Sequence, residues 1–170
     1  MKKQRLSLVG ILDTPKKVSL TRLEGIARRL RSRGKRMVFT NGCFDLLHVG
    51  HVGYLEMARK LGDYLVVGLN ADASVRKLKG PSRPITSEAA RARVLAGLGC
   101  VDHIVLFRTK RVTPLLLRLR PEIYVKGGDY TPETMDPGER RAVERAGGRI
   151  RILPVWKGYS TTSTLKKIFA

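Results

Sequence analysis

The chain has 170 residues, 42% of them hydrophobic and 28% charged, a balance typical of a soluble globular domain with its own core. Its 34 lysines and arginines outnumber its 14 aspartates and glutamates, and the resulting formal net charge of +20 favours anionic substrates or partners. No run of residues is apolar over the thickness of a bilayer, and the short apolar stretch 6–12 lacks the cleavage site of a signal peptide, so we expect a cytoplasmic protein with no membrane partner.

The first predicted element is an amphipathic helix near the N-terminus. Apolar residues recur there at helical spacing, which predicts a helix from Ser19 to Arg33 packed against the domain. The apolar positions are Leu20, Leu23, Ile26, Ala27 and Leu30. We interpret residues 1–35 as an N-terminal extension to which no chemistry is assigned.

Beyond residue 36, strand-like and helix-like segments alternate. The strand-like segments are short and lack a polar face, which is typical of parallel strands covered on both sides. Strands are predicted at Met37–Thr40, Tyr64–Asn70, His103–Phe107, Ile123–Lys126 and Arg149–Val155, and helices at Gly50–Leu61, Ser87–Leu98, Thr113–Leu119, Gly138–Ala146 and Thr162–Phe169. The pattern predicts a single α/β domain over residues 1–170, with a Rossmann-like, doubly wound, five-stranded parallel sheet and helices on both faces. Ligands of such sheets bind beyond the carboxyl ends of the strands.

The segment between the first of these strands and the following helix reads TNGCFDLLHVGH, from Thr40 to His51. Gly42 and Gly50 let the backbone come close to a ligand, and the start of the helix offers unpaired N–H groups and a positive dipole end. His48 and His51 add hydrogen-bond donors in the same place. The segment therefore predicts a phosphate-binding site and, with it, nucleotide chemistry.

Metal binding and helix capping are the alternative roles for these histidines. Residues i and i+3 at a helix start can bind a transition metal or can serve as structural caps. His103, the third histidine, lies in a distant predicted strand, and no acid follows in the zincin pattern. Phosphate contact is therefore favoured, and no residue is assigned to a metal. Cys43 and Cys100 also lack metal-site spacing, and both are predicted to be reduced thiols.

Further blocks follow along the chain: NADASV from Asn70, LKG at Leu78–Gly80, RPI at Arg83–Ile85, KGGDY at Lys126–Tyr130 and STT at Ser160–Thr162. Together with TNGCFDLLHVGH they resemble, in order and spacing, the nucleotidyltransferase superfamily that contains the cytidylyltransferases. The form of the blocks is close to that of the heptose-phosphate adenylyltransferases. Several blocks in the family's order are far more specific than a single motif.

The resemblance implies a role for each matching position. His48, His51, Lys77 and Lys79 are expected to be catalytic, because phosphoryl transfer depends on positioning and on electrostatic stabilisation. Expected nucleotide-binding residues are Thr40, Asn41, Gly42, Cys43, Phe44, Gly50, Arg91, Lys126, Gly127, Gly128, Asp129, Ser160, Thr161 and Thr162, and expected sugar-phosphate-binding residues are Asp45, Asn70, Asp72 and Arg83. Taken alone, many of these positions are also typical of turns, helix caps or a solvated basic loop over residues 76–83. Arg91 matches a superfamily arginine that contacts nucleotide phosphate, but Ala89 replaces the acid that usually stands two positions earlier.

The predicted reaction joins ATP and D-glycero-D-manno-heptose 1-phosphate to give ADP-heptose and pyrophosphate, with Mg²⁺ as cofactor and a homodimer as the expected assembly. Within the same class, the alternative is a cytidylyltransferase acting on glycerol phosphate or a similar phospho-alcohol. The alternative from another class is a basic nucleic-acid-binding protein on an inactive fold. It is disfavoured because the basic residues are dispersed, with five tyrosines, four phenylalanines and one tryptophan available for stacking on bases, so no specific nucleic-acid partner is predicted.

Overall fold

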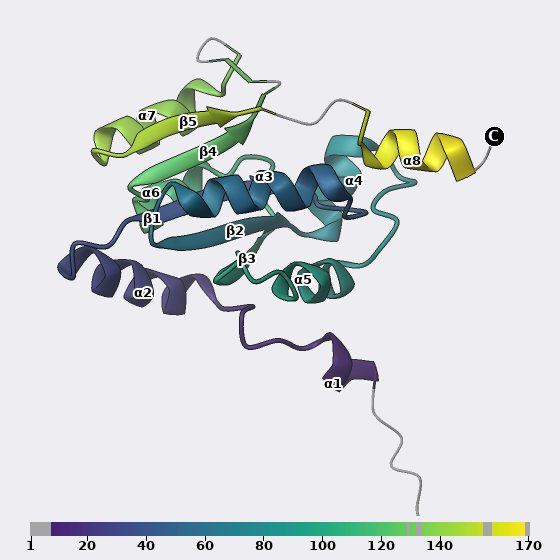
Figure 1. Ribbon diagram of the computed structural model, residues 1–170, viewed down its shortest axis with the longest axis horizontal. Coiled ribbons are helices and arrows are strands. Elements are labelled where there is room, and N and C mark those ends of the chain that lie inside the picture. Colours follow the sequence, from purple (N-terminus) through teal and green to yellow (C-terminus); the bar gives the residue numbers. More distant parts are fainter. Residues whose placement is uncertain (1–7, 129, 132–133, 155–157, 169–170) are drawn as a thin grey trace, which may run out of the picture.

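The computed structural model describes residues 8–128, 130–131, 134–154 and 158–168. Its strands form a five-stranded, all-parallel sheet in the order β3-β2-β1-β4-β5 (Figure 1). The strands are β1 Met37–Gly42, β2 Tyr64–Asn70, β3 His103–Phe107, β4 Ile123–Gly127 and β5 Arg149–Leu153. This order confirms the predicted doubly wound sheet. It also places the point where the chain changes direction across the sheet between β1 and β4, which is where open α/β sheets bind ligands.

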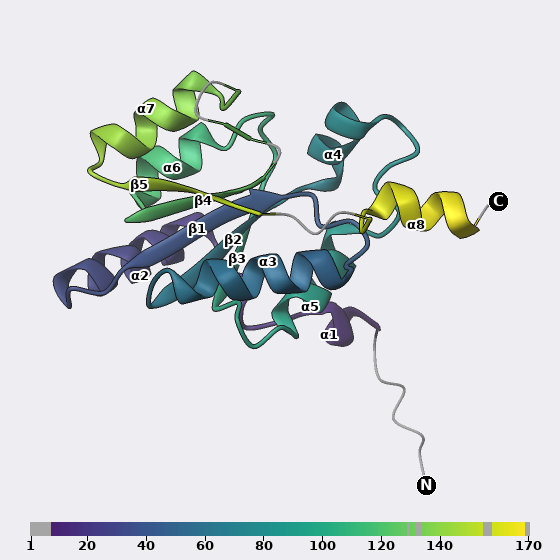
Figure 2. The ribbon, with the colours of Figure 1, turned by 45° about the horizontal axis from the view of Figure 1, so that its top comes forward.

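Helices cover both faces of the sheet, as Figures 1 and 2 show. Alternate residues of β1 point to opposite faces, so that Phe39 packs in the core under α2, α6 and α7 while Val38 packs in the core under α3 and α5. The helices are α1 Leu8–Leu12, α2 Leu20–Ser32, α3 Val49–Lys60, α4 Asp72–Lys79, α5 Glu88–Ala96, α6 Thr113–Leu119, α7 Pro137–Arg145 and α8 Thr161–Ile168. None of the described helices is long and apolar enough to cross a membrane.

Side-chain caps explain where several helices begin. Ser19 caps α2 by accepting a hydrogen bond from the Arg22 amide, and Ser87 caps α5 in the same way. Asp136 caps α7 and is followed by proline at the first helical position, where the missing N–H costs nothing. The predicted helices therefore begin within about two residues of their observed starts.

Two short helices were not predicted, and two predicted segment ends lie outside the described residues. Neither α1 nor α4 was predicted. The basic residues of α4 lie in its last turn, where they interact favourably with the negative end of the helix dipole, and Gly80 ends the helix with φ +97°. The loop predicted at Gly80–Pro84 is present. The predicted ends of the last strand and last helix, Val155 and Phe169, lie outside the described residues.

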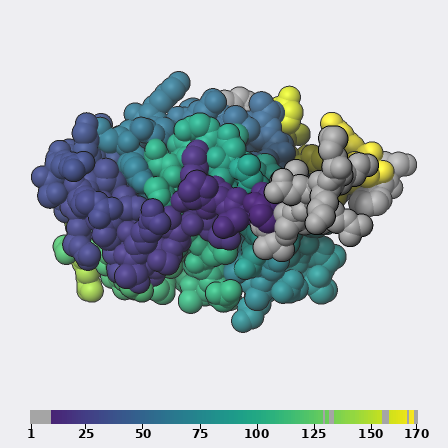
Figure 3. Space-filling model, turned by 90° about the horizontal axis from the view of Figure 1, so that it is seen from below, coloured from purple at the N-terminus to yellow at the C-terminus, as the bar shows by residue number. Residues whose placement is uncertain are grey.

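The segment before α2 covers the edge of the sheet. The amide of Val18 donates to the carbonyl of Ile104 in β3 at 2.9 Å, and the Ile104 amide donates to the Lys16 carbonyl at 2.8 Å. Arg93 of α5 also donates to the Ile11 carbonyl at 3.0 Å. In Figure 3 this purple segment runs over the teal and green part of the surface. The N-terminal extension thus satisfies backbone groups of an otherwise open edge strand.

Candidate active site

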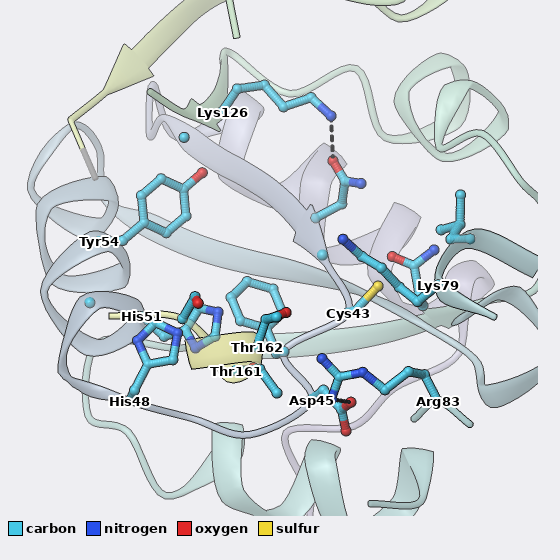
Figure 4. A pocket seen from close by; sticks show the side chains of 18 of the residues that line it. Cys43, Asp45, His48, His51, Tyr54, Lys79, Arg83, Lys126, Thr161 and Thr162 are labelled. Carbon is cyan, nitrogen blue, oxygen red and sulfur yellow. Dashed lines mark hydrogen bonds and ion pairs between the residues drawn. The ribbon is translucent and has the colours of Figure 1, made fainter. Parts of the chain in front are cut away.

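A cleft of about 620 Å³ opens at the carboxyl ends of the strands. Its walls come from the loops after β1 and β4, the end of α4, the loop between β3 and α6, and the starts of α3 and α8 (Figure 4). The residues that line it are Asn41, Gly42, Cys43, Phe44, Asp45, His48, Gly50, His51, Tyr54, Asn70, Leu78, Lys79, Arg83, Lys110, Arg111, Lys126, Gly127, Tyr130, Glu139, Tyr159, Ser160, Thr161 and Thr162. The structure therefore brings together most of the positions that the sequence motifs indicated.

The loop after β1 is tightly packed beneath the cleft. A Cβ atom at Gly42 would lie 2.9 Å from the ring of Phe44, so that only glycine fits there without a shift. Phe44 itself has a left-handed backbone, with φ +44°, and is 6% exposed. An aromatic residue in this conformation is strained, and such strain persists only where the surroundings fix it. The loop therefore presents its backbone to the cleft in one defined shape.

His48 and His51 lie at the start of α3 with their rings stacked, the centroids 3.8 Å apart. The Nδ1 atom of each ring is buried and has no hydrogen-bond partner in the described part of the chain. Burial lowers the pKa of His48, and burial together with the neighbouring His48 lowers the pKa of His51 to about 4. Both rings are therefore neutral near pH 7. Buried polar atoms without partners are uncommon, and here they lie at a helix N-terminus, where an anion is favoured.

A second helix start meets the first. Thr161 begins α8 and donates its hydroxyl hydrogen bond to the Leu46 carbonyl, at 3.3 Å, which ties α8 to the loop before α3. Gly50 lies close to both elements at this junction, because a Cβ there would lie 3.1 Å from Nδ1 of His48, which would have to shift slightly, and in ordinary contact with Cβ of Tyr159 at 3.6 Å. Two helix N-termini, one with a histidine pair and one with the Ser160–Thr162 hydroxyls, thus converge on the same side of the cleft.

Asp45 and Arg83, both expected at the sugar phosphate, are paired with each other at 2.8 Å. The Asp45 carboxylate also accepts hydrogen bonds from the amides of Ile85 and Thr86, at 2.8 and 3.2 Å. Asp45 therefore holds the loop that follows α4 against the loop that follows β1. Both side chains still line the cleft, with Lys79 beside them at the end of α4 (Figure 4).

Near the ends of β1 and β4, Lys126 of β4 and Glu139 of α7 form a buried ion pair, with Nζ and Oε2 3.0 Å apart. Lys126 also lies 3.3 Å from Oδ1 of Asn41 and over the ring of Tyr130, with 4.7 Å to its centroid. The Tyr124 hydroxyl is 2.8 Å from the Glu139 carboxylate, and burial and that carboxylate raise the tyrosine's pKa strongly. This corner of the cleft is close to neutral overall and suits uncharged hydroxyl or base groups more than phosphates.

Comparison with known proteins decides the family. Residues 39–164 match the family described as cytidylyltransferase-like. The chain belongs to this family. That membership agrees with the motif blocks, and it confirms the family predicted from them.

The relatives of this cytidylyltransferase-like chain are longer proteins. The bifunctional protein HldE of Syntrophotalea carbinolica is 56% identical over 138 residues, which are 81% of this chain and 28% of that protein. The protein of the same name from Geotalea uraniireducens is 53% identical over 150 residues, 88% of this chain and 30% of that one. The chain thus spans less than a third of the length of these relatives.

Solved structures show the same fold. A lipopolysaccharide core biosynthesis protein from Thermoplasma volcanium has a TM-score of 0.59 and 29% identity, over 75% of this chain and all of that one. A pantoate-beta-alanine ligase from Francisella tularensis has a TM-score of 0.54 over 83% of this chain and 67% of its own, and at 13% identity it supports the fold alone.

Arg91 has a different place from the one its family position suggested. It is 2% exposed and donates to the carbonyls of Cys43, Asn70 and Thr86 and to the Asp72 carboxylate. Glu88, the acidic residue nearest to it in the sequence, instead accepts the Asp72 amide at 2.8 Å. All three guanidinium nitrogens are engaged with the protein, so the geometry supports a positioning role in place of direct phosphate contact. Arg91 joins the ends of β1 and β2 to α5.

Other expected site residues also lie away from the cleft. Thr40 is fully buried, and its hydroxyl contacts the Tyr54 hydroxyl at 2.8 Å and the Val125 carbonyl at 3.0 Å. The Asp72 carboxylate is paired with the Arg91 guanidinium. Lys77 and Gly128 do not line the cleft, because the cleft-facing residues of α4 are Leu78 and Lys79 and those after β4 are Lys126 and Gly127. Asp129 lies outside the described residues.

Several cleft residues were missed by the sequence analysis: Tyr54, Lys110, Arg111 and Glu139. Tyr54 lies one helical turn after His51, and Lys110 and Arg111 follow the end of β3. Helix periodicity could have indicated Tyr54, and the rule that parallel strands end at one edge could have indicated Lys110 and Arg111. Glu139 lies in a helix of charged residues, and no local signal marks it.

Proposed function

We propose that the chain is a sugar-phosphate adenylyltransferase that joins ATP and D-glycero-D-manno-heptose 1-phosphate to give ADP-heptose and pyrophosphate. The observation that carries the proposal is the convergence of the α3 and α8 N-termini, with two neutral histidines, on one cleft. The relatives named HldE support the choice of substrates, since that name denotes a bifunctional enzyme whose C-terminal domain is a heptose 1-phosphate adenylyltransferase.

The reaction needs no nucleophile from the protein. An oxygen of the sugar 1-phosphate attacks the α-phosphorus of ATP, the new P–O bond forms as the bond to the β-phosphate oxygen breaks, and pyrophosphate carries away the electron pair. Negative charge grows on the departing pyrophosphate, where His48, His51 and the α8 amides donate hydrogen bonds. Such preorganised donors stabilise the transition state more than the ground state.

Lys79 has a separate part in this reaction. Two anions, the sugar phosphate and the triphosphate, must approach each other in line, and their repulsion opposes attack. Lys79 lines the cleft at the end of α4 and pairs with no carboxylate in the described part of the chain. We assign it to neutralising this repulsion.

The cofactor Mg²⁺ fits this site as the partner of ATP more than of the protein. The described residues contain no group of three or more His, Cys, Asp or Glu side chains that could hold a metal ion. Among the described residues that line the cleft, the carboxylates Asp45 and Glu139 are already paired with Arg83 and Lys126. Mg²⁺ commonly binds through substrate phosphates with few protein ligands, and it would neutralise charge on the triphosphate.

A cytidylyltransferase is the second candidate function, because the matching family carries that description. The two candidates share the phosphate-binding elements and differ in the base and the acceptor. A pyrophosphate-release assay with Mg²⁺ separates them when ATP and CTP are each offered with heptose 1-phosphate and with glycerol 3-phosphate.

We expect pyrophosphate release with ATP and heptose 1-phosphate, and almost no release in the His51→Ala variant. Release with CTP alone would replace it by a cytidylyltransferase. No pyrophosphate release in any combination, together with salt-sensitive binding of RNA or DNA that persists in His48→Ala, would favour the nucleic-acid-binding alternative.

A further inference from the structure

Basic side chains of the cleft differ in whether their charge is neutralised. Within the described part of the chain, three of them are held in ion pairs: Arg83 with Asp45 at 2.8 Å, Arg111 with Asp136 at 3.1 Å, and Lys126 with Glu139 at 3.0 Å. Lys79 and Lys110 have no carboxylate partner among the described residues. Two lysine charges therefore remain available to a ligand, and only Lys79 belongs to a motif.

The loop that carries Lys110 is fixed on both sides of it. Ser74 of α4 donates its hydroxyl hydrogen bond to the Thr109 carbonyl at 3.1 Å, and the Thr109 hydroxyl donates to the Arg111 carbonyl at 2.7 Å. The pair between Arg111 and Asp136 then ties the loop to the start of α7. The backbone that presents Lys110 is thus preorganised, which reduces the entropy lost when its ammonium group binds an anion.

Lys110 also approaches the cleft from the side opposite the histidines. Its loop leads into α6, which packs with α7 on one face of the sheet, whereas His48 and His51 begin α3 on the other face. Figure 2 shows these helices on either side of the strand ends. A phosphate chain bound by the histidines therefore has Lys79 and Lys110 on its far side.

We propose that Lys110 is a further substrate-binding residue, whose ammonium group, with that of Lys79, binds phosphoryl oxygens in the cleft. The chemistry fits, because a lysine ammonium is a compact charge that binds phosphate strongly. The phosphoryl group belongs to the nucleotide or to the sugar phosphate. That assignment of substrates rests on the proposed function, but phosphate binding by Lys110 does not.

The test compares Lys110→Ala with Arg108→Ala. Arg108 lies two residues earlier on the same loop, its side chain is 78% exposed, and it does not line the cleft, so its loss removes the same charge without removing a cleft contact. Binding of inorganic tripolyphosphate and of heptose 1-phosphate is measured by calorimetry at one ionic strength. For at least one ligand, Kd should rise about tenfold or more in Lys110→Ala, as expected for a lost charge-assisted hydrogen bond. Arg108→Ala should change Kd by about twofold at most, because long-range charge effects are screened by salt.

The ligand whose Kd rises in Lys110→Ala shows which substrate carries the phosphate that Lys110 binds. A rise for tripolyphosphate, matched by a higher KM for ATP, assigns Lys110 to the nucleotide, and a rise for heptose 1-phosphate, matched by a higher KM for the sugar, assigns it to the acceptor. Lys110→Arg should restore most of the affinity, and both alanine variants should unfold at the native temperature.

Two results separate this inference from the proposed function. Tripolyphosphate binding that depends on Lys110, in a protein that makes no ADP-heptose, would keep the inference and overturn the function. Equal affinities of the native protein, Lys110→Ala and Arg108→Ala for both ligands would overturn the inference, whatever the enzyme's activity.

Discussion

The two sides of the cleft stabilise anions in different ways. On the α3 and α8 side the polar groups are neutral, namely two imidazoles, hydroxyls and backbone amides, and the Nδ1 atoms of His48 and His51 have no partner in the described chain. On the other walls of the cleft the groups are charged, but three of the five basic side chains described there are already paired. The first side thus supplies oriented donors, and the second supplies a small net positive charge. A site of this kind favours charge that develops during reaction over an anion that is merely bound tightly.

The largest expected effect concerns the donor side. His51→Ala should lower kcat for pyrophosphate release about 10²–10³-fold, equivalent to roughly 3–4 kcal/mol, as for loss of one preorganised donor to a developing charge. Its effect on folding stability should be smaller, because the Nδ1 atom makes no hydrogen bond in the described structure. Steady-state kinetics and urea unfolding measure the two effects. A variant with native kcat would show that His51 is not a catalytic donor.

The next largest effect concerns Arg91, which supports the loops beneath the cleft. Arg91→Met should lower the free energy of unfolding by about 3 kcal/mol, because it leaves the Asp72 carboxylate and three carbonyls without their donor. Arg93→Met on the same helix is the matched control. Its side chain is exposed and donates to one carbonyl, so we expect about 0.5 kcal/mol. Equal losses of stability in the two variants would contradict the positioning role of Arg91.

A smaller effect on KM should distinguish Lys79 from Lys77, which both lie in α4. Lys79→Ala should raise the KM for at least one substrate about tenfold, since a charge-assisted contact is lost, while Lys77→Ala should leave both KM values within about twofold. The difference arises because Lys79 lines the cleft and Lys77 does not. Comparable defects in both variants would mean that overall charge, and not cleft position, determines affinity.

An effect of similar size is the pH dependence of stability. The pKa of His51 is lowered to about 4 by burial and by His48, whereas in the unfolded chain it lies near 6.5. The unfolded state therefore takes up the proton first, so this contribution to stability is complete above about pH 6.5 and is lost as the pH falls towards 4. Allowing for solvent screening, the loss should be about 1–2 kcal/mol. Urea unfolding between pH 7 and pH 4 should show a shallower decline in His51→Asn, and identical profiles would contradict the lowered pKa.

The sequence predicts those parts of the molecule that depend on local pattern. Apolar strands such as Tyr64–Asn70 and caps such as Ser87 depend on neighbouring residues, so the sheet and most helices follow from them. The histidines were found because a helix start and its glycines are contiguous. The partners of Arg91 come from three separate segments, and Glu139 meets Lys126 only after the sheet has formed, so no spacing rule indicates them. The sequence also does not indicate that Arg91 is buried. An arginine that binds nucleotide phosphate and an arginine that holds several segments of the chain together can match the same motif position.

The most direct test of the account is an NMR titration of the three histidines with and without ATP and Mg²⁺. Without the nucleotide, His48 and His51 should titrate below the ordinary range, because burial favours their neutral forms. ATP should raise both pKa values, because phosphate oxygens accept hydrogen bonds from the rings and favour their protonated forms. His103, which is hydrogen-bonded to Tyr64 and lies outside the cleft, serves as the internal control and should not change. If ATP binds while the pKa values of His48 and His51 stay unchanged, the histidine pair does not bind phosphate. That result would contradict the observation on which the proposed function depends.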